Sequence, residues 1–207
     1  MQYLLKMKNM IFLFILGISV LSVNAQEFDK QVALAKSAYD AGNYEESRFA
    51  VQNALHEIDK MIGQEVLALL PEKIDNMSYN PSGDQISGSG TTYVGLFIER
   101  TWGTTETGSM EFSVISDSPL IGTVNTFLSL PSIMYSSDSN QKKIKVEGFK
   151  AMLEKKVDEN NAVTGYSLML PYSNSLLQLN YTGETTEEAF LAMVNQIPVT
   201  KVTEVAR

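Results

Sequence analysis

His56 is the only histidine in this chain of 207 residues, and cysteine is absent. A catalytic triad needs a nucleophile placed beside its histidine, and metal sites rarely rely on one histidine. The lack of cysteine excludes disulfides, thiolate nucleophiles and Cys-ligated metals. Because His56 falls off the apolar stripe of its predicted helix, we expect it on the polar, solvated face.

Other residues that could do chemistry have simpler explanations. Glu45-Glu46 and Glu187-Glu188 fall in the first turns of predicted helices, where negative charge complements the helix dipole. Ser87–Gly90 lacks the Gly-Lys-Ser/Thr end of a phosphate-binding loop, and Asp138–Asn140 lacks the glycine and distal glutamate of a calcium loop. We therefore predict no catalytic residue, no metal ligand and no cofactor.

One apolar segment and one aromatic residue are candidates for binding. Residues 119–135 carry no charge and have apolar residues on more than one helical face. Such a segment usually packs against a sheet, but an exposed part would mark an interface or a lid over an apolar pocket. Trp102 is the only tryptophan and follows Arg100 closely. It could stack on a ligand or lie at the rim of the core.

The first 25 residues have the features of a secretory signal peptide. Lys6 and Lys8 precede the apolar run Met10–Val23, and compact residues flank an expected cleavage after Ala25. The run is shorter than the ~20 apolar residues that a membrane-spanning helix needs. We expect export to the periplasm or the cell exterior, and no membrane span in the mature chain.

The net charge argues against nucleic acid as a partner. The formal charge is −8, and cleavage after Ala25 would leave 14 basic against 24 acidic residues, or −10. Such a surface repels nucleic acid and anionic lipid headgroups. The chain also lacks a basic run interleaved with aromatic residues, which is typical of nucleic-acid binding.

Residues 26–70 predict two helices in succession. The first extends from Glu27 to Ala41, because apolar residues recur every three or four positions, and Gly42 ends it. Asn43 with Glu46 predicts a capping box at the start of the second helix. The two apolar stripes are Phe28, Val32, Ala35 and Tyr39, then Val51, Leu55, Ile58, Ile62, Val66 and Leu69.

The second stripe keeps its phase through Gly63 and predicts one long helix that ends before Pro71. A break at Gly63 is the alternative.

This hairpin resembles a single tetratricopeptide repeat over residues 28–58. The resemblance rests on Gly42–Glu46 at the turn and on Ala54-Leu55 in the second helix, whereas Ser47 and Ala38 depart from the repeat pattern. It implies an antiparallel helical hairpin, and members of that family bind peptides in grooves built by several repeats. Because one repeat cannot bury its apolar face by itself, we expect this one to pack on the rest of the chain.

The remaining chain predicts an α+β fold. Residues 71–91 are rich in Pro, Gly, Ser and Asn and predict an irregular linker. Residues 92–200 show alternating patterns typical of an antiparallel sheet of about five or six strands. One helix is predicted after Asp117–Pro119 with Ser118 as N-cap, and another from Thr185 to Pro198 with Thr185 and Glu188 as capping box. Residues 201–207 would form a C-terminal tail.

Residues 70–200 also resemble a group of uncharacterised exported bacterial proteins. The shared features are Leu70-Pro71, Glu99-Arg100, Asp117–Pro119, Thr182-Gly183 and the final helix. This resemblance supports the α+β class and implies no activity.

Three functional hypotheses follow from these patterns. The first is a non-catalytic protein-binding or assembly module of the bacterial cell envelope, with a partner bound by the hairpin or by residues 119–135. The second is a carrier of a small apolar ligand, with residues 119–135 as the lid. The third is a hydrolase that lacks a recognisable motif. The oligomeric state stays open.

Overall fold

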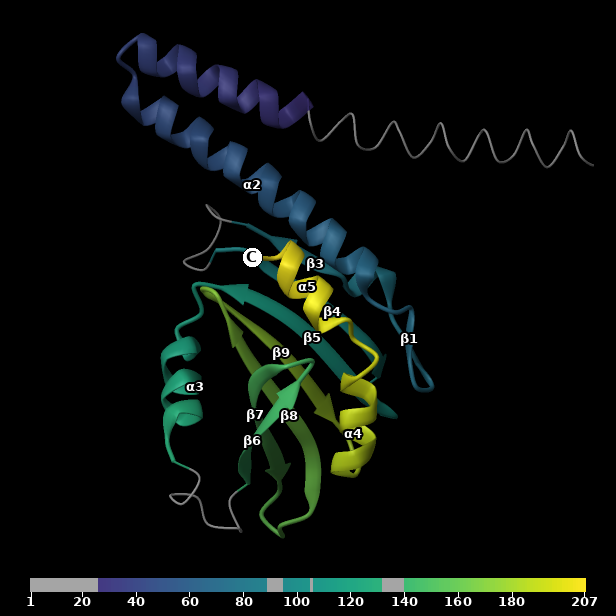
Figure 1. Ribbon diagram of the computed structural model, residues 1–207. Helices are drawn as coiled ribbons and strands as arrows, with labels where there is room; N and C mark the ends of the chain where they lie inside the picture. The colour runs from purple at the N-terminus through teal and green to yellow at the C-terminus, as the bar shows by residue number, and fades with distance from the viewer. Residues whose placement is uncertain (1–25, 89–94, 105, 132–139) are drawn as a thin grey trace, which may run out of the picture. The chain divides into compact units, whose positions relative to one another are not determined.

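The computed structural model describes residues 26–88, 95–104, 106–131 and 140–207 (Figure 1). The chain forms two compact units, Met1–Met61 and Ile62–Arg207, and the boundary falls inside one long helix. We call residues 26–61 the hairpin unit and residues 62–207 the sheet unit. The predicted α+β class, with a helical hairpin and an antiparallel sheet, is confirmed.

The hairpin unit consists of α1, described over residues 26–40, and the first part of α2 (Tyr44–Leu69). Gly42 adopts a φ of 78° in the turn, which a residue with a Cβ takes only with strain. Asn43 caps α2 as predicted, since the Glu46 amide donates to Asn43 Oδ1 at 3.3 Å. The predicted capping box is only half formed, because Glu46 Oε2 accepts from Asn43 Nδ2 at 2.7 Å and the Asn43 backbone N–H donates to Ala38. Helix α2 continues through Gly63 without a break, as the phase of its stripe predicted.

Small residues fill the contact between the two helices of the hairpin unit. Ala35 and Ala38 of α1 are buried, together with Ser47, Ala50 and Ala54 of α2. The Ser47 hydroxyl donates to the carbonyl of Ala35 at 2.9 Å, so the helix backbones lie close together. The predicted stripes therefore have the right period, but their large members lie beside this contact and not within it.

The sheet unit is built on seven antiparallel strands in the order β3-β4-β5-β9-β8-β7-β6. Two short strands, β1 and β2, form a separate ladder. The strands are β1 (Lys73–Ile74), β2 (Met77–Ser78), β3 (Gln85–Ser87), β4 (Phe97–Thr104), β5 (Gly108–Ser116), β6 (Gln141–Val146), β7 (Phe149–Val157), β8 (Val163–Tyr172) and β9 (Ser175–Thr182). The helices are η1 (Pro81–Gly83), α3 (Leu120–Ser129), α4 (Glu187–Val194) and α5 (Val199–Val205).

Several sequence predictions need correction here, one of which is that the N-cap of α3 is Pro119 and not Ser118. The expected irregular linker, residues 71–91, contains β1, β2, η1 and β3, whose two or three residues are too short to show alternation. The expected tail, residues 201–207, belongs largely to α5, in which Val202 is fully buried. The N-cap of α4 is Thr186 and not Thr185, since the Thr186 hydroxyl accepts from the amide of Ala189 at 3.2 Å.

The main core lies on one face of the seven-stranded sheet. It takes in the last turns of α2 and all of α4 and α5, which Figure 1 shows on the same side of the strands. Fully buried members include Val66, Trp102, Phe112, Leu168, Leu179, Phe190, Val194 and Val202. Helix α3 packs on the opposite face, where Val124 contacts Met152 and Leu176. A well-packed sheet unit thus forms around the end of α2.

Candidate functional site: the apolar face of the hairpin

Large apolar side chains on the hairpin unit remain in contact with solvent. Tyr39 and Tyr44 are 63% and 67% exposed, and Leu55 is 46% exposed. Scattered exposed apolar residues are ordinary on protein surfaces, whereas a contiguous group marks an interaction site. The complete set comprises Val32, Leu34, Tyr39, Tyr44, Phe49, Val51, Leu55, Ile58 and Met61.

Most of these side chains lie on one side of the hairpin. Viewed along each helix from its N-terminus, Val32 and Tyr39 are rotated clockwise from the buried alanines of α1. Val51 and Leu55 are rotated in the same direction from the buried alanines of α2. Because the two helices run antiparallel, this common offset brings both stripes to the same side.

Contact between the two tyrosines at the turn confirms that arrangement. The rings of Tyr39 and Tyr44 meet edge to face, with centroids 5.6 Å apart. We call the group Val32, Tyr39, Tyr44, Val51, Leu55 and Ile58 the apolar face.

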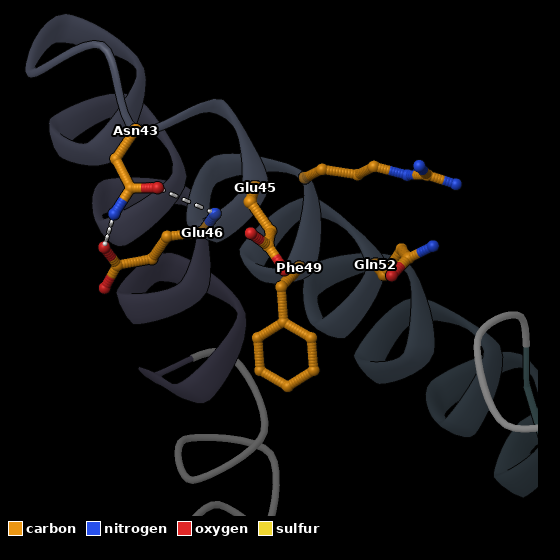
Figure 2. Close-up of a pocket in the computed structure, with 6 residues that line it drawn as sticks. Asn43, Glu45, Glu46, Phe49 and Gln52 are labelled. Atoms are coloured by element: carbon orange, nitrogen blue, oxygen red, sulfur yellow. Dashed lines mark hydrogen bonds between the residues drawn. The ribbon is translucent and has the colours of Figure 1, made fainter.

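The opposite side of α2 has a different character. An open hollow of about 590 Å³ there is lined by residues at the start of α2, namely Asn43, Glu45, Glu46, Arg48, Phe49 and Gln52. Figure 2 shows Phe49 projecting away from the helix between Glu45 and Gln52, with the two hydrogen bonds between Asn43 and Glu46 nearby. Polar and charged groups dominate this surface, so Phe49 is an isolated apolar residue there.

His56 is less exposed than the sequence predicted. Its Nδ1 atom is buried and makes no hydrogen bond among the described residues, although the residue lies on the side of α2 away from the apolar face. Within the described residues, no group of three His, Asp or Glu side chains is placed to hold a metal ion. A single imidazole in this setting supplies neither a metal site nor a triad.

Arg100 and Trp102 have structural roles in the sheet unit. The Arg100 guanidinium pairs with Asp84 through two hydrogen bonds of 2.8 and 2.5 Å and lies 4.2 Å from the centre of the Tyr79 ring. It also donates to the carbonyls of Leu67 and Leu70 at the end of helix α2, where carbonyls lack their regular helical partners.

Trp102 is fully buried, so the ligand-stacking hypothesis for this residue is wrong. Its indole N–H donates to the carbonyl of Pro71 at 2.9 Å. Both Arg100 and Trp102 thus fasten the chain that follows α2 onto β4.

Sequence reasoning missed a row of polar side chains on the second face of the sheet. Asn180 Nδ2 donates to Glu111 Oε1 at 3.2 Å, and the Ser167 hydroxyl donates to Asn180 Oδ1 at 2.7 Å. Glu99 lies on the adjoining strand, and its pKa is raised by burial and by the charge of Glu111. These side chains line an extended sheet surface. Strand alternation was the signal that could have found them.

The two glutamate pairs lie where the sequence predicted, at the starts of helices. Glu46 accepts a hydrogen bond from the side chain of the N-cap residue Asn43, and Glu187 accepts one from the Lys142 ammonium group. Gly88 is the last described residue of the glycine-rich stretch, and most of Asp138–Asn140 lies outside the described residues.

The uncharged segment of residues 119–135 contains α3, and its last four residues lie outside the described part of the chain. Val124 is 1% exposed against the sheet, whereas Leu120 and Leu130 are 44% and 38% exposed. Helix α3 therefore combines a packed inner face with two exposed leucines, one at each of its ends.

No helix in the described residues combines the length and apolar character needed to cross a bilayer. Comparison of the chain with family models, with curated proteins and with solved structures finds no match.

Proposed function

We propose that this protein is a non-catalytic binding or assembly module of the bacterial cell envelope, and that the hairpin binds an amphipathic helix of a protein partner through its apolar face. The observation that carries the proposal is the gathering of Val32, Tyr39, Tyr44, Val51, Leu55 and Ile58 on one side of two helices.

The shape of the face favours a helical partner. The two antiparallel helices of the hairpin present their apolar stripes side by side. A third helix can pack between two such stripes, with its ridges of side chains in their grooves. A tetratricopeptide-like hairpin uses the same kind of surface to stack on its neighbour, since a single repeat leaves one face uncovered. Tyrosine and leucine supply the apolar area that anchors a bound helix.

Because most of the exposed apolar residues gather on one side of the hairpin, we expect a partner to cover that side only. Six large apolar residues lie on the apolar face, whereas Leu34 of α1 and Phe49 of α2 lie away from it. A repeat inside an array would need apolar contacts on both sides. This hairpin has the pattern of a repeat that ends an array.

The test compares the two sides of α2 with photo-crosslinking residues at position 55 and at position 49 of the protein expressed in its native cells. We expect position 55 to crosslink one defined protein and position 49 to crosslink none reproducibly. The double substitution Val51→Glu and Leu55→Glu should abolish binding of that purified protein. The matched pair Phe49→Glu and Gln52→Glu should leave its binding unchanged.

Circular dichroism at 222 nm checks that both double variants keep their helices. Equal crosslinking at both positions, or binding that survives Val51→Glu with Leu55→Glu, would refute the proposal.

A further inference from the structure

Positive charge is concentrated at one edge of the sheet unit, although the whole chain has a formal charge of −8. Six of the 16 basic residues lie on β6 and β7, whereas this stretch includes only Glu147 and Glu154 as acids. The six are Lys142, Lys143, Lys145, Lys150, Lys155 and Lys156. The edge of the sheet formed by β6 and β7 is therefore basic, although the chain as a whole is acidic.

Two of these lysines oppose each other directly. Lys145 and Lys150 are register partners across β6 and β7, and both are exposed. Neither forms a salt bridge in the part of the chain that the structure describes. Glu147 in the intervening turn instead accepts from the backbone amide of Thr200 at 2.6 Å. Like charges directly opposite each other destabilise a strand pair. An anion bound by both lysines would therefore reduce the repulsion between them.

Apolar groups lie beside the same lysines. Lys143, Lys145 and Lys150 line a hollow of about 330 Å³ together with Leu128 and Ile144. The Lys143 ammonium group donates to the carbonyl of Leu130 and lies 5.9 Å from the centre of the Phe127 ring, which ties β6 to the end of α3. The adjoining Leu130 is 38% exposed. Ammonium groups and apolar side chains therefore lie next to each other on this surface.

We propose that this surface, formed by Lys143, Lys145, Lys150, Leu128 and Leu130, docks on bilayers that contain anionic phospholipids. The lysines complement the phosphate groups, and the leucines enter the boundary between headgroups and acyl chains. Helix α3 adds no charge, because Leu120–Ser129 contains no ionisable residue. An acidic protein partner would gain from the lysines but would not require the exposed leucine beside them.

The test measures co-sedimentation of the protein with vesicles of phosphatidylglycerol and phosphatidylcholine, and with vesicles of phosphatidylcholine alone. We expect binding to the mixed vesicles only, with release at high salt. A lysine near an anionic surface contributes about fivefold to the partition coefficient, so Lys145→Gln with Lys150→Gln should weaken binding about 25-fold. Leu130→Ser should weaken it a few-fold, and this loss should persist when the salt concentration changes.

The matched control is Lys73→Gln with Lys201→Gln, which removes the same charge from exposed positions of β1 and α5. This variant should bind the mixed vesicles within about twofold of the unsubstituted protein. Equal loss in both double variants, equal binding to uncharged vesicles or no binding at all would overturn the proposal. Binding of soluble polyglutamate at the same ionic strength with no binding to vesicles would also overturn it and would identify an acidic polypeptide as the partner.

Discussion

The hairpin unit and the sheet unit treat their large apolar residues in opposite ways. The sheet unit buries Trp102, Phe112 and Phe190 completely. The hairpin unit buries alanines and one serine between its helices and leaves Tyr44 and Leu55 exposed. Burial of a large apolar side chain contributes about 1.5–3 kcal/mol, so the sheet unit holds most of the stability that packing can supply. The hairpin unit keeps the same kind of side chain available for a partner.

The comparison is tested most strongly by Trp102→Ala, set against Leu55→Ala. We expect Trp102→Ala to lower the free energy of unfolding by about 3–5 kcal/mol, because it opens a cavity and leaves the carbonyl of Pro71 without its donor. Leu55→Ala should change it by less than about 0.5 kcal/mol, as is usual for exposed positions. Urea denaturation measures both. Similar losses in the two variants would mean that the apolar face is already covered within the protein.

The next largest effect concerns the ion pair at the end of α2. Arg100→Met should cost about 3 kcal/mol or more, because it leaves the Asp84 carboxylate without its partner and removes a donor from the carbonyls of Leu67 and Leu70. Adding Asp84→Asn to the same chain should recover part of this loss, since the uncompensated charge is then removed. Denaturation of the two single variants and the double variant forms the cycle that measures it. A strictly additive double variant would show that the pair is not coupled.

A smaller effect is expected inside the hairpin. Ala50 is fully buried against α1, so Ala50→Leu should overpack the contact and cost about 1–3 kcal/mol. The loss should appear in the helical signal at 222 nm, and Ala41→Leu in the exposed turn serves as the control. If Ala50→Leu left the melting curve unchanged, the helices would be separated more widely than the Ser47–Ala35 hydrogen bond indicates.

The smallest effect is a pH dependence on the open face of the sheet. The pKa of Glu99 is raised above its ordinary value of 4.5, first by burial and then by Glu111. A raised carboxyl pKa means that the folded state holds the proton more tightly, so its contribution is present below pH 4.5 and is lost as the pH rises through the folded pKa.

Glu99→Gln should therefore be slightly more stable than the unsubstituted protein at pH 7, by less than about 0.5 kcal/mol. The two should converge as the pH falls toward 4, as measured by denaturation at both values. Glu159→Gln in an exposed turn should show no such trend. A gain that is the same at both pH values would mean that repulsion between Glu99 and Glu111 is not its source.

Local patterns in the sequence were sufficient for the class of fold and for the longer elements, but not for the short elements of residues 71–91 or for α5. Gly42, Asn43 and Glu46 predicted the hairpin turn, and the period of the stripe predicted an unbroken α2. The sequence did not predict which side of each hairpin helix packs against the other helix. Periodicity shows that apolar residues share one face of a helix, but it does not show what that face contacts. The positions of the alanines indicate the packing side, because two helix backbones can approach closely only where the side chains between them are small.

Long-range contacts were beyond the reach of such patterns. Asp84 lies 16 positions from Arg100, and the Leu67 carbonyl lies 33 positions away. Nothing in the spacing of these residues indicates that they meet. The same holds for Lys145 and Lys150, whose opposition depends on the register of the β6–β7 hairpin.

The two edges of the seven-stranded sheet bear on how the protein behaves when it is concentrated. β3, at one edge, is only three residues long, and β6, at the other, carries three lysines in six residues. Short or lysine-rich edge strands are poor templates for the addition of a foreign strand, which is how amyloid and other β-aggregates begin. Replacement of the β6 lysines would thus be expected to cost solubility during overexpression before it cost any stability.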